Sequence, residues 1–274
     1  MKTSSSELKK RARRNLKGGY GLCIGAQFLA GAVLVVISLV YVLTSFSMGL
    51  VKDPFSAGIN STFAGNMALR AGIYLSFLVI LSVYSLLIPG TLKIYLNMST
   101  GHKARLSDLL FAFQNKPHKF IGLYLLNVLI GFIWAIPYFV VLAVALITDF
   151  IPVMVVLLVL TYLFLLIGSI FTMLCLSQSM YILIESPDQR VWRCLKESAH
   201  MMKGNKGRFF YLYISFSGMI ILGYCSLGIG FLWIFPYIYA TMTEYYLDLK
   251  GQFSHNSFGG VEEAFSQSMW ENQW

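Results

Sequence analysis

The segment Met201–Phe216, MMKGNKGRFFYLYISF, changes character in its middle. Three basic residues and two glycines are followed directly by an aromatic and apolar run. Basic residues collect in the cytoplasmic loops of membrane proteins, and Trp and Tyr collect at the interface between membrane and water. The segment therefore predicts a turn at a membrane surface, followed by a helix that enters the bilayer.

The composition of the whole chain agrees with this interpretation. Of the 274 residues, 57% are hydrophobic and 12% are charged, which is about half the charged share of a typical soluble domain. The apolar residues gather in six blocks, at residues 20–44, 72–98, 120–147, 151–184, 209–224 and 229–246.

A spanning helix needs about 20 apolar residues, so the first four blocks are long enough to cross a bilayer. The last two blocks are short, and they form either a full hairpin or a re-entrant element. No block shows the alternation of a barrel strand, and helices then satisfy the backbone in lipid. We expect an all-α polytopic membrane protein with about six transmembrane helices.

The basic residues divide unevenly between the two sides of these blocks. Only Lys52 and Arg70, of the 21 Lys and Arg residues, fall on the side opposite to the amino terminus. The positive-inside rule then places both termini in the cytoplasm. We expect residues 1–250 to form a single integral domain in the plasma membrane and residues 251–274 to form a cytoplasmic tail.

Two other segments share the pattern of the opening stretch. Leu16–Ile24 reads LKGGYGLCI and Phe113–Ile121 reads FQNKPHKFI, to be compared with MKGNKGRFF at Met202–Phe210. Short amphipathic segments precede all three, and we expect them to lie in the headgroup region with their apolar faces toward the lipid. Their predicted apolar residues are Leu8, Ala12 and Leu16 in the helix at 4–17, then Leu106, Leu109, Leu110 and Phe113, then Val191, Leu195, Ser198, Ala199 and Met202.

The pattern predicts a unit of an interfacial helix, a turn and a transmembrane hairpin, present three times. The alternative is that membrane loops gather Lys, Gly and aromatic residues by chance. The predicted turn glycines are Gly18, Gly204 and Gly207. The basic residues expected to contact lipid headgroups are Arg13, Arg14, Lys17, Lys116, Lys119, Arg190, Arg193, Lys203, Lys206 and Arg208.

A second similarity links Ile133–Phe139, IWAIPYF, with Leu232–Ile238, LWIFPYI. Each segment places a tryptophan three residues before a proline, as Trp134 with Pro137 and Trp233 with Pro236. Proline inside a spanning helix frees a carbonyl and allows a kink. The shared pattern predicts either a packing device or a hinge.

Four stretches together resemble a known family. They are ELKKRARRNLKGGY at Glu7–Tyr20, LSDLLFAF at Leu106–Phe113, the opening stretch, and GIGFLWIFPYIYATMTEYYLDL at Gly228–Leu249. They are similar to the bacterial domain-of-unknown-function family 975, and the resemblance covers roughly residues 5–250. It implies an integral plasma-membrane protein, and it brings no activity, substrate or catalytic residue.

Few residues of the chain are candidates for a catalytic or metal-binding role. No ionisable residue lies near the middle of an apolar block, and such residues are the usual sign of function inside a membrane. The histidines and cysteines do not stand at metal-ligand spacing. We therefore expect no enzyme, no cofactor and no nucleic-acid binding. Three neutral polar residues inside the blocks, Gln27, Asn127 and Gln178, either bond helices together or line a cavity.

Two functions from different classes follow from the sequence. The first is a non-enzymatic scaffold, assembly or accessory factor that engages the anionic inner leaflet and holds a membrane-protein partner or a second copy of itself. The alternative is a carrier or transporter subunit for a small solute or an amphiphile. A water-filled cavity at the midplane would favour the carrier.

Overall fold

The computed structural model describes residues 3–47, 63–148 and 151–271, and every regular element in these ranges is helical. This confirms the predicted all-α class. The elements in chain order are α1 Ser5–Leu16, α2 Tyr20–Ser47, α3 Phe63–Ser99, the 3-10 helix η2 Leu106–Leu110, α4 Phe111–Gln114, α5 Pro117–Ile147, α6 Pro152–Leu176, α7 Ser179–Glu185, α8 Val191–Met201, α9 Lys206–Ile214, α10 Ser217–Cys225 and α11 Phe231–Glu271.

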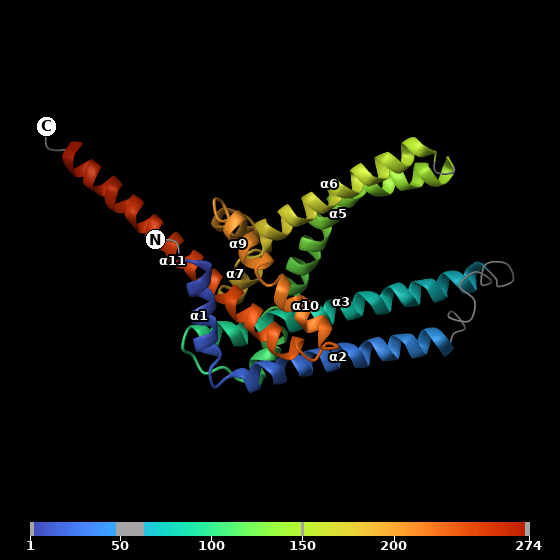
Figure 1. Cartoon of the computed structure of the whole chain (residues 1–274), viewed down its shortest axis with the longest axis horizontal. Coiled ribbons are helices and arrows are strands. Elements are labelled where there is room, and N and C mark those ends of the chain that lie inside the picture. Colours follow the sequence, from blue (N-terminus) through green and yellow to red (C-terminus); the bar gives the residue numbers. More distant parts are fainter. Residues whose placement is uncertain (1–2, 48–62, 149–150, 272–274) are drawn as a thin grey trace.

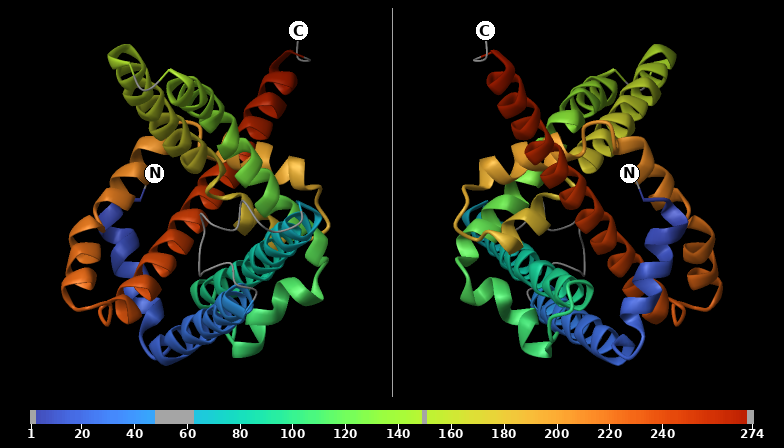
Figure 2. Two further views of the ribbon diagram at one scale, coloured as in Figure 1. Left: turned by 90° about the vertical axis from the view of Figure 1, so that its right-hand side faces the viewer. Right: turned by 90° about the vertical axis from the view of Figure 1, so that its left-hand side faces the viewer.

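Two long hairpins project from a base of shorter elements (Figure 1). One hairpin is α2 with α3, the other is α5 with α6, and both point to the right in that view, whereas α11 leaves the base on the opposite side. The views in Figure 2 are along the hairpins. They show the α2–α3 hairpin, the α5–α6 hairpin and the α9–α10 segment on different sides of the base. The hydrophobic core lies in the base, where helix ends from distant parts of the chain meet.

The apolar helices confirm the membrane-like character of the chain. Among the residues that the structure describes, four helical segments are long and apolar enough to cross a membrane, namely Tyr20–Leu43, Pro117–Ile147, Pro152–Glu185 and Lys206–Cys225. Only 6–22% of the residues in their apolar windows are buried within the protein. Apolar surface left open in this way requires lipid around it, so these helices indicate a membrane protein.

The other two predicted spans are parts of longer helices. Residues 72–98 lie inside α3, and residues 231–246 of the predicted span 229–246 lie inside α11, which begins at Phe231. The predicted tail at 251–274 is also not a separate segment, since α11 runs without interruption to Glu271. Residues 272–274 lie outside the described part of the chain.

The predicted fourth span, 151–184, is broken at Ser177 and Gln178 into α6 and α7. The hydroxyl of Ser198 on α8 lies at this break: it donates to the Cys175 carbonyl at 2.8 Å and accepts from the Gln178 amide at 3.2 Å. A side chain that satisfies backbone groups in this way allows a helix to end inside apolar surroundings. The predicted span 209–224 is likewise divided, into α9 and α10.

Helix α1 begins where the sequence predicts and packs differently. The Ser4 side chain accepts from the Glu7 amide as an N-cap. The predicted apolar residues Leu8, Ala12 and Leu16 are buried, but α11 covers them. The apolar face of α1 is therefore turned toward protein and not toward lipid.

The other two amphipathic segments also differ from expectation. The second is a 3-10 turn followed by a short helix, in which Leu109 and Ala112 are buried while Leu106, Leu110 and Phe113 stay exposed. In the third, α8 begins at Val191 and buries Cys194, Leu195, Ser198 and Met201. Both pack on helix ends of the base, so protein contacts select which residues are covered.

Candidate functional site

The turns that follow the short helices α1, α4 and α8 each contain a residue in the left-handed region. These residues are Gly18 before α2, Lys116 before α5 and Gly204 before α9, with φ of 85°, 54° and 77°. Glycine adopts this conformation at little cost, which explains Gly18 and Gly204 as turn residues. The predicted turn residue Gly207 instead lies within α9 and does not have a positive φ.

Two of the predicted lipid-contacting lysines join parts of the base. Lys119 donates to the carbonyls of Pro187, Asp188 and Gln189 at 2.9, 2.7 and 3.0 Å. Lys116 donates to the Asp188 carboxylate, and this hydrogen bond holds the pKa of Asp188 below its usual range. The Lys119 ammonium holds the start of α5 against the turn between α7 and α8, and Lys116 adds an exposed ion pair at the same turn.

Arg208 is also engaged by the protein. Its guanidinium pairs with the Asp248 carboxylate, and the two side chains are 16% and 8% exposed. Asp248 also accepts from the Thr3 hydroxyl and from the Gln252 amide. The ion pair connects α9 with α11, and Asp248 links both to Thr3 near the amino terminus, so Arg208 holds part of the base together.

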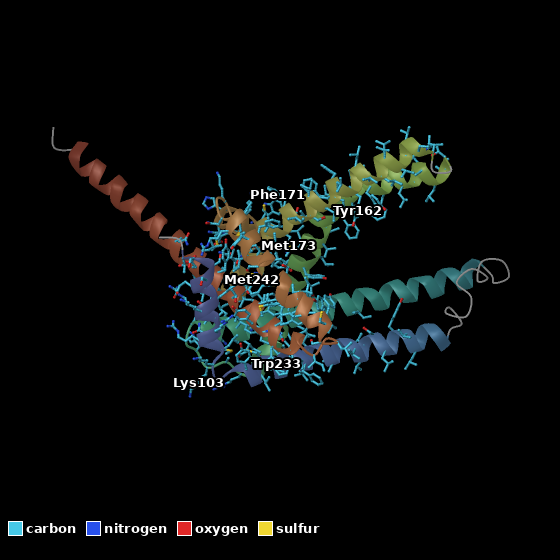
Figure 3. All side chains as sticks on the ribbon, in the orientation of Figure 1. Lys103, Tyr162, Phe171, Met173, Trp233 and Met242 are labelled. Carbon is cyan, nitrogen blue, oxygen red and sulfur yellow. The ribbon has the colours of Figure 1, made fainter. Side chains whose placement is uncertain are left out.

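The remaining predicted cations lie at the surface of the base. Arg13 is exposed with its guanidinium 5.1 Å from the Tyr237 ring centre. Lys206 is half-buried, with its Nζ 4.0 Å from the centre of the Phe171 ring. The other exposed cations of the predicted set are Arg14, Lys17, Arg190, Arg193 and Lys203. Figure 3 shows side-chain nitrogen atoms along the edge of the base that lies away from the hairpin tips, near the labelled Lys103.

The tryptophan and proline pattern has two different environments. Trp134 packs on α6, where its indole Nε1 donates to the Thr172 hydroxyl at 2.7 Å. The ring lies so close to Gly168 that a Cβ there would be 2.1 Å from it. Trp233, by contrast, is 54% exposed. The interpretation as a packing device fits Trp134 only.

The three predicted cavity residues do not meet. Gln27 lines a groove of about 330 Å³ between α2, α3 and α11, and donates to the Tyr95 hydroxyl at 3.0 Å. Asn127 lines a separate groove of about 310 Å³ between α5 and α6, and donates to the Leu123 carbonyl at 3.0 Å. Gln178 is buried at the break between α6 and α7.

A polar cavity in the base was not predicted from the sequence. It has a volume of about 630 Å³ and lies between the carboxyl-terminal ends of α3 and α7, α8 and the middle of α11. On its wall, Glu185 accepts hydrogen bonds from the Tyr246 hydroxyl and from Lys250 Nζ, both at 2.6 Å. Lys93 and Glu197 also line it, so groups of both signs face the same space.

The polar cavity offers hydrogen bonds and charge, but no cluster that would hold a metal. Among the described residues there is no group of three or more His, Cys, Asp or Glu side chains placed to bind a metal ion. The signal that could have indicated the cavity is a pair of ionisable residues, Glu185 and Lys250, at the ends of two apolar blocks. Nothing in their sequence positions, 65 residues apart, predicts their contact.

The comparison with known families agrees with the resemblance seen in the sequence. Residues 1–252 match the family described as Protein of unknown function (DUF975), and the chain belongs to this family. No curated protein and no solved structure matches the chain.

Proposed function

We propose that this member of the family is a non-enzymatic scaffold, assembly or accessory factor of the plasma membrane. Its hairpins cross the bilayer, and its base lies at the anionic inner leaflet with both termini in the cytoplasm. The observation that carries this proposal is the separation of two surfaces. The hairpins expose apolar side chains, whereas exposed Lys and Arg residues collect on the base.

The cations of the base supply the attraction to the leaflet. Each Lys or Arg near an anionic surface contributes about 1 kcal/mol, and the contribution falls off within a Debye length. Exposed cations that are not used inside the base remain available for this role. They come from the turn after α1 (Lys17), from α8 (Arg193) and from the turn after α8 (Lys203).

The packing of the base supports a threefold repeat, which we include in the proposal. The short helix α1 packs on α11, η2 with α4 packs on α3, and α8 packs on α7. The element η2 with α4 therefore packs on the end of the α2–α3 hairpin, and α8 packs on α7, which follows the α5–α6 hairpin. The first short helix, α1, packs on the last long helix, α11. A ring closed in this way gives a rigid platform from which two hairpins diverge, as a scaffold for partner helices requires.

The experiment that tests the proposal is gentle purification from native membranes, followed by mass spectrometry of the proteins and lipids that remain bound. We expect a stoichiometric membrane-protein partner or a second copy of the chain, with enrichment of anionic lipid. A bound solute without any protein partner would contradict the scaffold. A reporter fused after Arg193 tests the orientation, and activity of that reporter outside the cell would overturn it.

A carrier remains the second candidate because Gln27 lines a groove inside the predicted membrane region together with Thr91 and Tyr239. Cysteine substituted at Gln27, Asn127 and Gln178 would distinguish the two functions. A carrier requires that water-soluble thiol reagents reach these positions from both sides of the membrane. The scaffold predicts that Gln178→Cys is protected, because Gln178 is 1% exposed.

A further inference from the structure

An apolar groove of about 320 Å³ lies where the α5–α6 hairpin leaves the base. Helices α5, α6 and α8 form its walls, with Ile133, Trp134, Phe171, Cys175 and Trp192 among the lining residues. Figure 3 shows the labelled Phe171 on α6 close to the base, on the same helix as Tyr162, which lies farther out. The groove is therefore placed at the level where a membrane helix meets the surface helix α8.

The walls of this groove present almost no unsatisfied polar group. The indole N–H of Trp134 is bonded to the Thr172 hydroxyl, so both polar atoms are used inside the wall. Gly168 allows the indole to lie flat against α6, since a Cβ would overlap the ring. Apolar concave surface of this kind binds hydrocarbon.

One lysine lines the groove, and a second contacts one of its lining rings. Lys196 lines it, with Nζ 5.8 Å from the centre of the Trp192 ring. Lys206 extends from the start of α9 to the Phe171 ring, which also lines the groove. An ammonium on an aromatic face is attracted to the ring but keeps hydrogen-bond donors directed outward.

Neither of these two ammonium groups has an anionic partner among the described residues, unlike Lys116 and Lys250. Within the described ranges, neither Lys196 nor Lys206 has a carboxylate within 4.0 Å, whereas Lys116 pairs with Asp188 and Lys250 pairs with Glu185. Charge that is held at an apolar groove without a partner is complementary to an anionic headgroup on an acyl chain.

We propose that this groove is a specific site for one anionic phospholipid of the inner leaflet. An acyl chain lies between Trp134, Phe171 and Trp192, and the phosphate lies between Lys196 and Lys206. The proposal rests on the proposed function, because it requires the base to lie at that leaflet. It goes beyond that function because it names one defined binding site, whereas a diffuse basic surface would attract anionic lipid without a defined site.

The experiment is native mass spectrometry of the full chain in a non-ionic detergent, titrated with dioleoyl phosphatidylglycerol and, separately, dioleoyl phosphatidylcholine. We expect one phosphatidylglycerol to bind before any phosphatidylcholine. The double variant Lys196→Gln with Lys206→Gln should weaken this first binding by about tenfold or more, since both charge-assisted contacts to the phosphate are lost.

A matched control removes two cations of the base that lie outside the groove and have no assigned lipid contact. Lys103→Gln with Arg105→Gln changes the net charge equally, and both residues are exposed. This control should leave the first phosphatidylglycerol within about twofold of the unmodified protein, because surface charge beyond the site is screened. A third variant, Cys175→Phe, keeps every charge and fills the groove, and it should also reduce the first binding. Tryptophan fluorescence reports whether each variant keeps the native fold.

The outcomes separate the site from the broader proposal. Equal weakening by the two double variants would overturn the site and leave an anionic surface in place. Retained binding in folded Cys175→Phe would also overturn the site. Equal binding of the two lipids by the unmodified protein would contradict both the site and the preference of the base for anionic lipid.

Discussion

Helices α6 and α7 come from one apolar block of the sequence and have opposite surroundings. In α7, five of the seven residues are buried, among them Tyr181 and Leu183. In α6, Gly168 alone of the 25 residues is buried. The comparison shows that apolar character alone does not distinguish a helix held by protein from a helix left to lipid.

This difference has an energetic meaning. In the base, apolar side chains pack against other side chains, and deleting their atoms removes contacts and leaves a cavity. On the lipid-facing side of a hairpin, lipid tails replace the deleted atoms, and no comparable cavity remains. Substitutions of the same chemistry should therefore have large effects in the base and small effects in the hairpins.

The largest expected effect is that of Leu183→Ala in α7. Leu183 has no exposed surface, so the substitution should lower the free energy of unfolding by ~2–5 kcal/mol. The matched control is Leu163→Ala in α6, where the side chain is 48% exposed, and its expected effect is within ~0.5 kcal/mol. Unfolding in detergent micelles, followed by tryptophan fluorescence, measures both. Equal losses would show that the hairpin is packed as tightly as the base.

A second test uses two glycines that lie in helices. A Cβ at Gly90 in α3 would lie 2.0 Å from the Leu109 carbonyl oxygen, so Gly90→Ala should separate α3 from η2 and destabilise by ~1–3 kcal/mol or more. Gly131 in α5 has no atom within 4 Å of such a Cβ, and Gly131→Ala should be neutral or stabilise by ~0.5–1 kcal/mol. Thermal unfolding in detergent checks the sign of both changes. Destabilisation by both variants would contradict the expectation that Gly90 is closely packed and that Gly131 is not.

A third test breaks the nearly buried ion pair of the base. Asp248→Asn leaves Arg208 without its carboxylate, and the free energy of unfolding should fall by ~1–3 kcal/mol. The control is Glu7→Gln, which removes the exposed Glu7 partner of Arg11 and should change little. Both are measured as shifts in chemical unfolding. If Asp248→Asn behaves as the control does, the contact between α9 and α11 contributes nothing to stability.

The smallest effect is expected at the surface of the same base. The Lys116 ammonium lowers the pKa of Asp188 below its ordinary value of 3.8. The stabilisation from their contact is therefore fully present above pH 3.8, and it is lost as the pH falls through the lowered pKa. Stability should therefore be the same for Asp188→Asn and the unmodified protein at pH 7, because an exposed pair contributes little. A clear fall in the thermal midpoint of Asp188→Asn at pH 7 would show that the contact between Lys116 and the α7–α8 turn stabilises the fold.

The sequence predicts some of the candidate site and misses the rest. The turn glycines Gly18 and Gly204 follow from local backbone chemistry, and both have the left-handed conformation. The polar cavity does not follow, because Glu185 and Lys250 come together only through the packing of α7 on α11. The same holds for Lys119, whose sequence position predicts a surface cation but whose ammonium is used by three carbonyls.

The sequence by itself determined the helical class and the position of α1, together with the apolar segments that need lipid. Hydropathy, caps and turn residues are local properties, and they are fixed before any helix meets another. Only the tertiary structure decided that α11 covers α1, that Ser198 completes the break between α6 and α7, and that Lys206 lies over Phe171 beside the groove that Lys196 lines. These are contacts between residues distant in sequence, and the free energy that selects them appears only when the base is assembled.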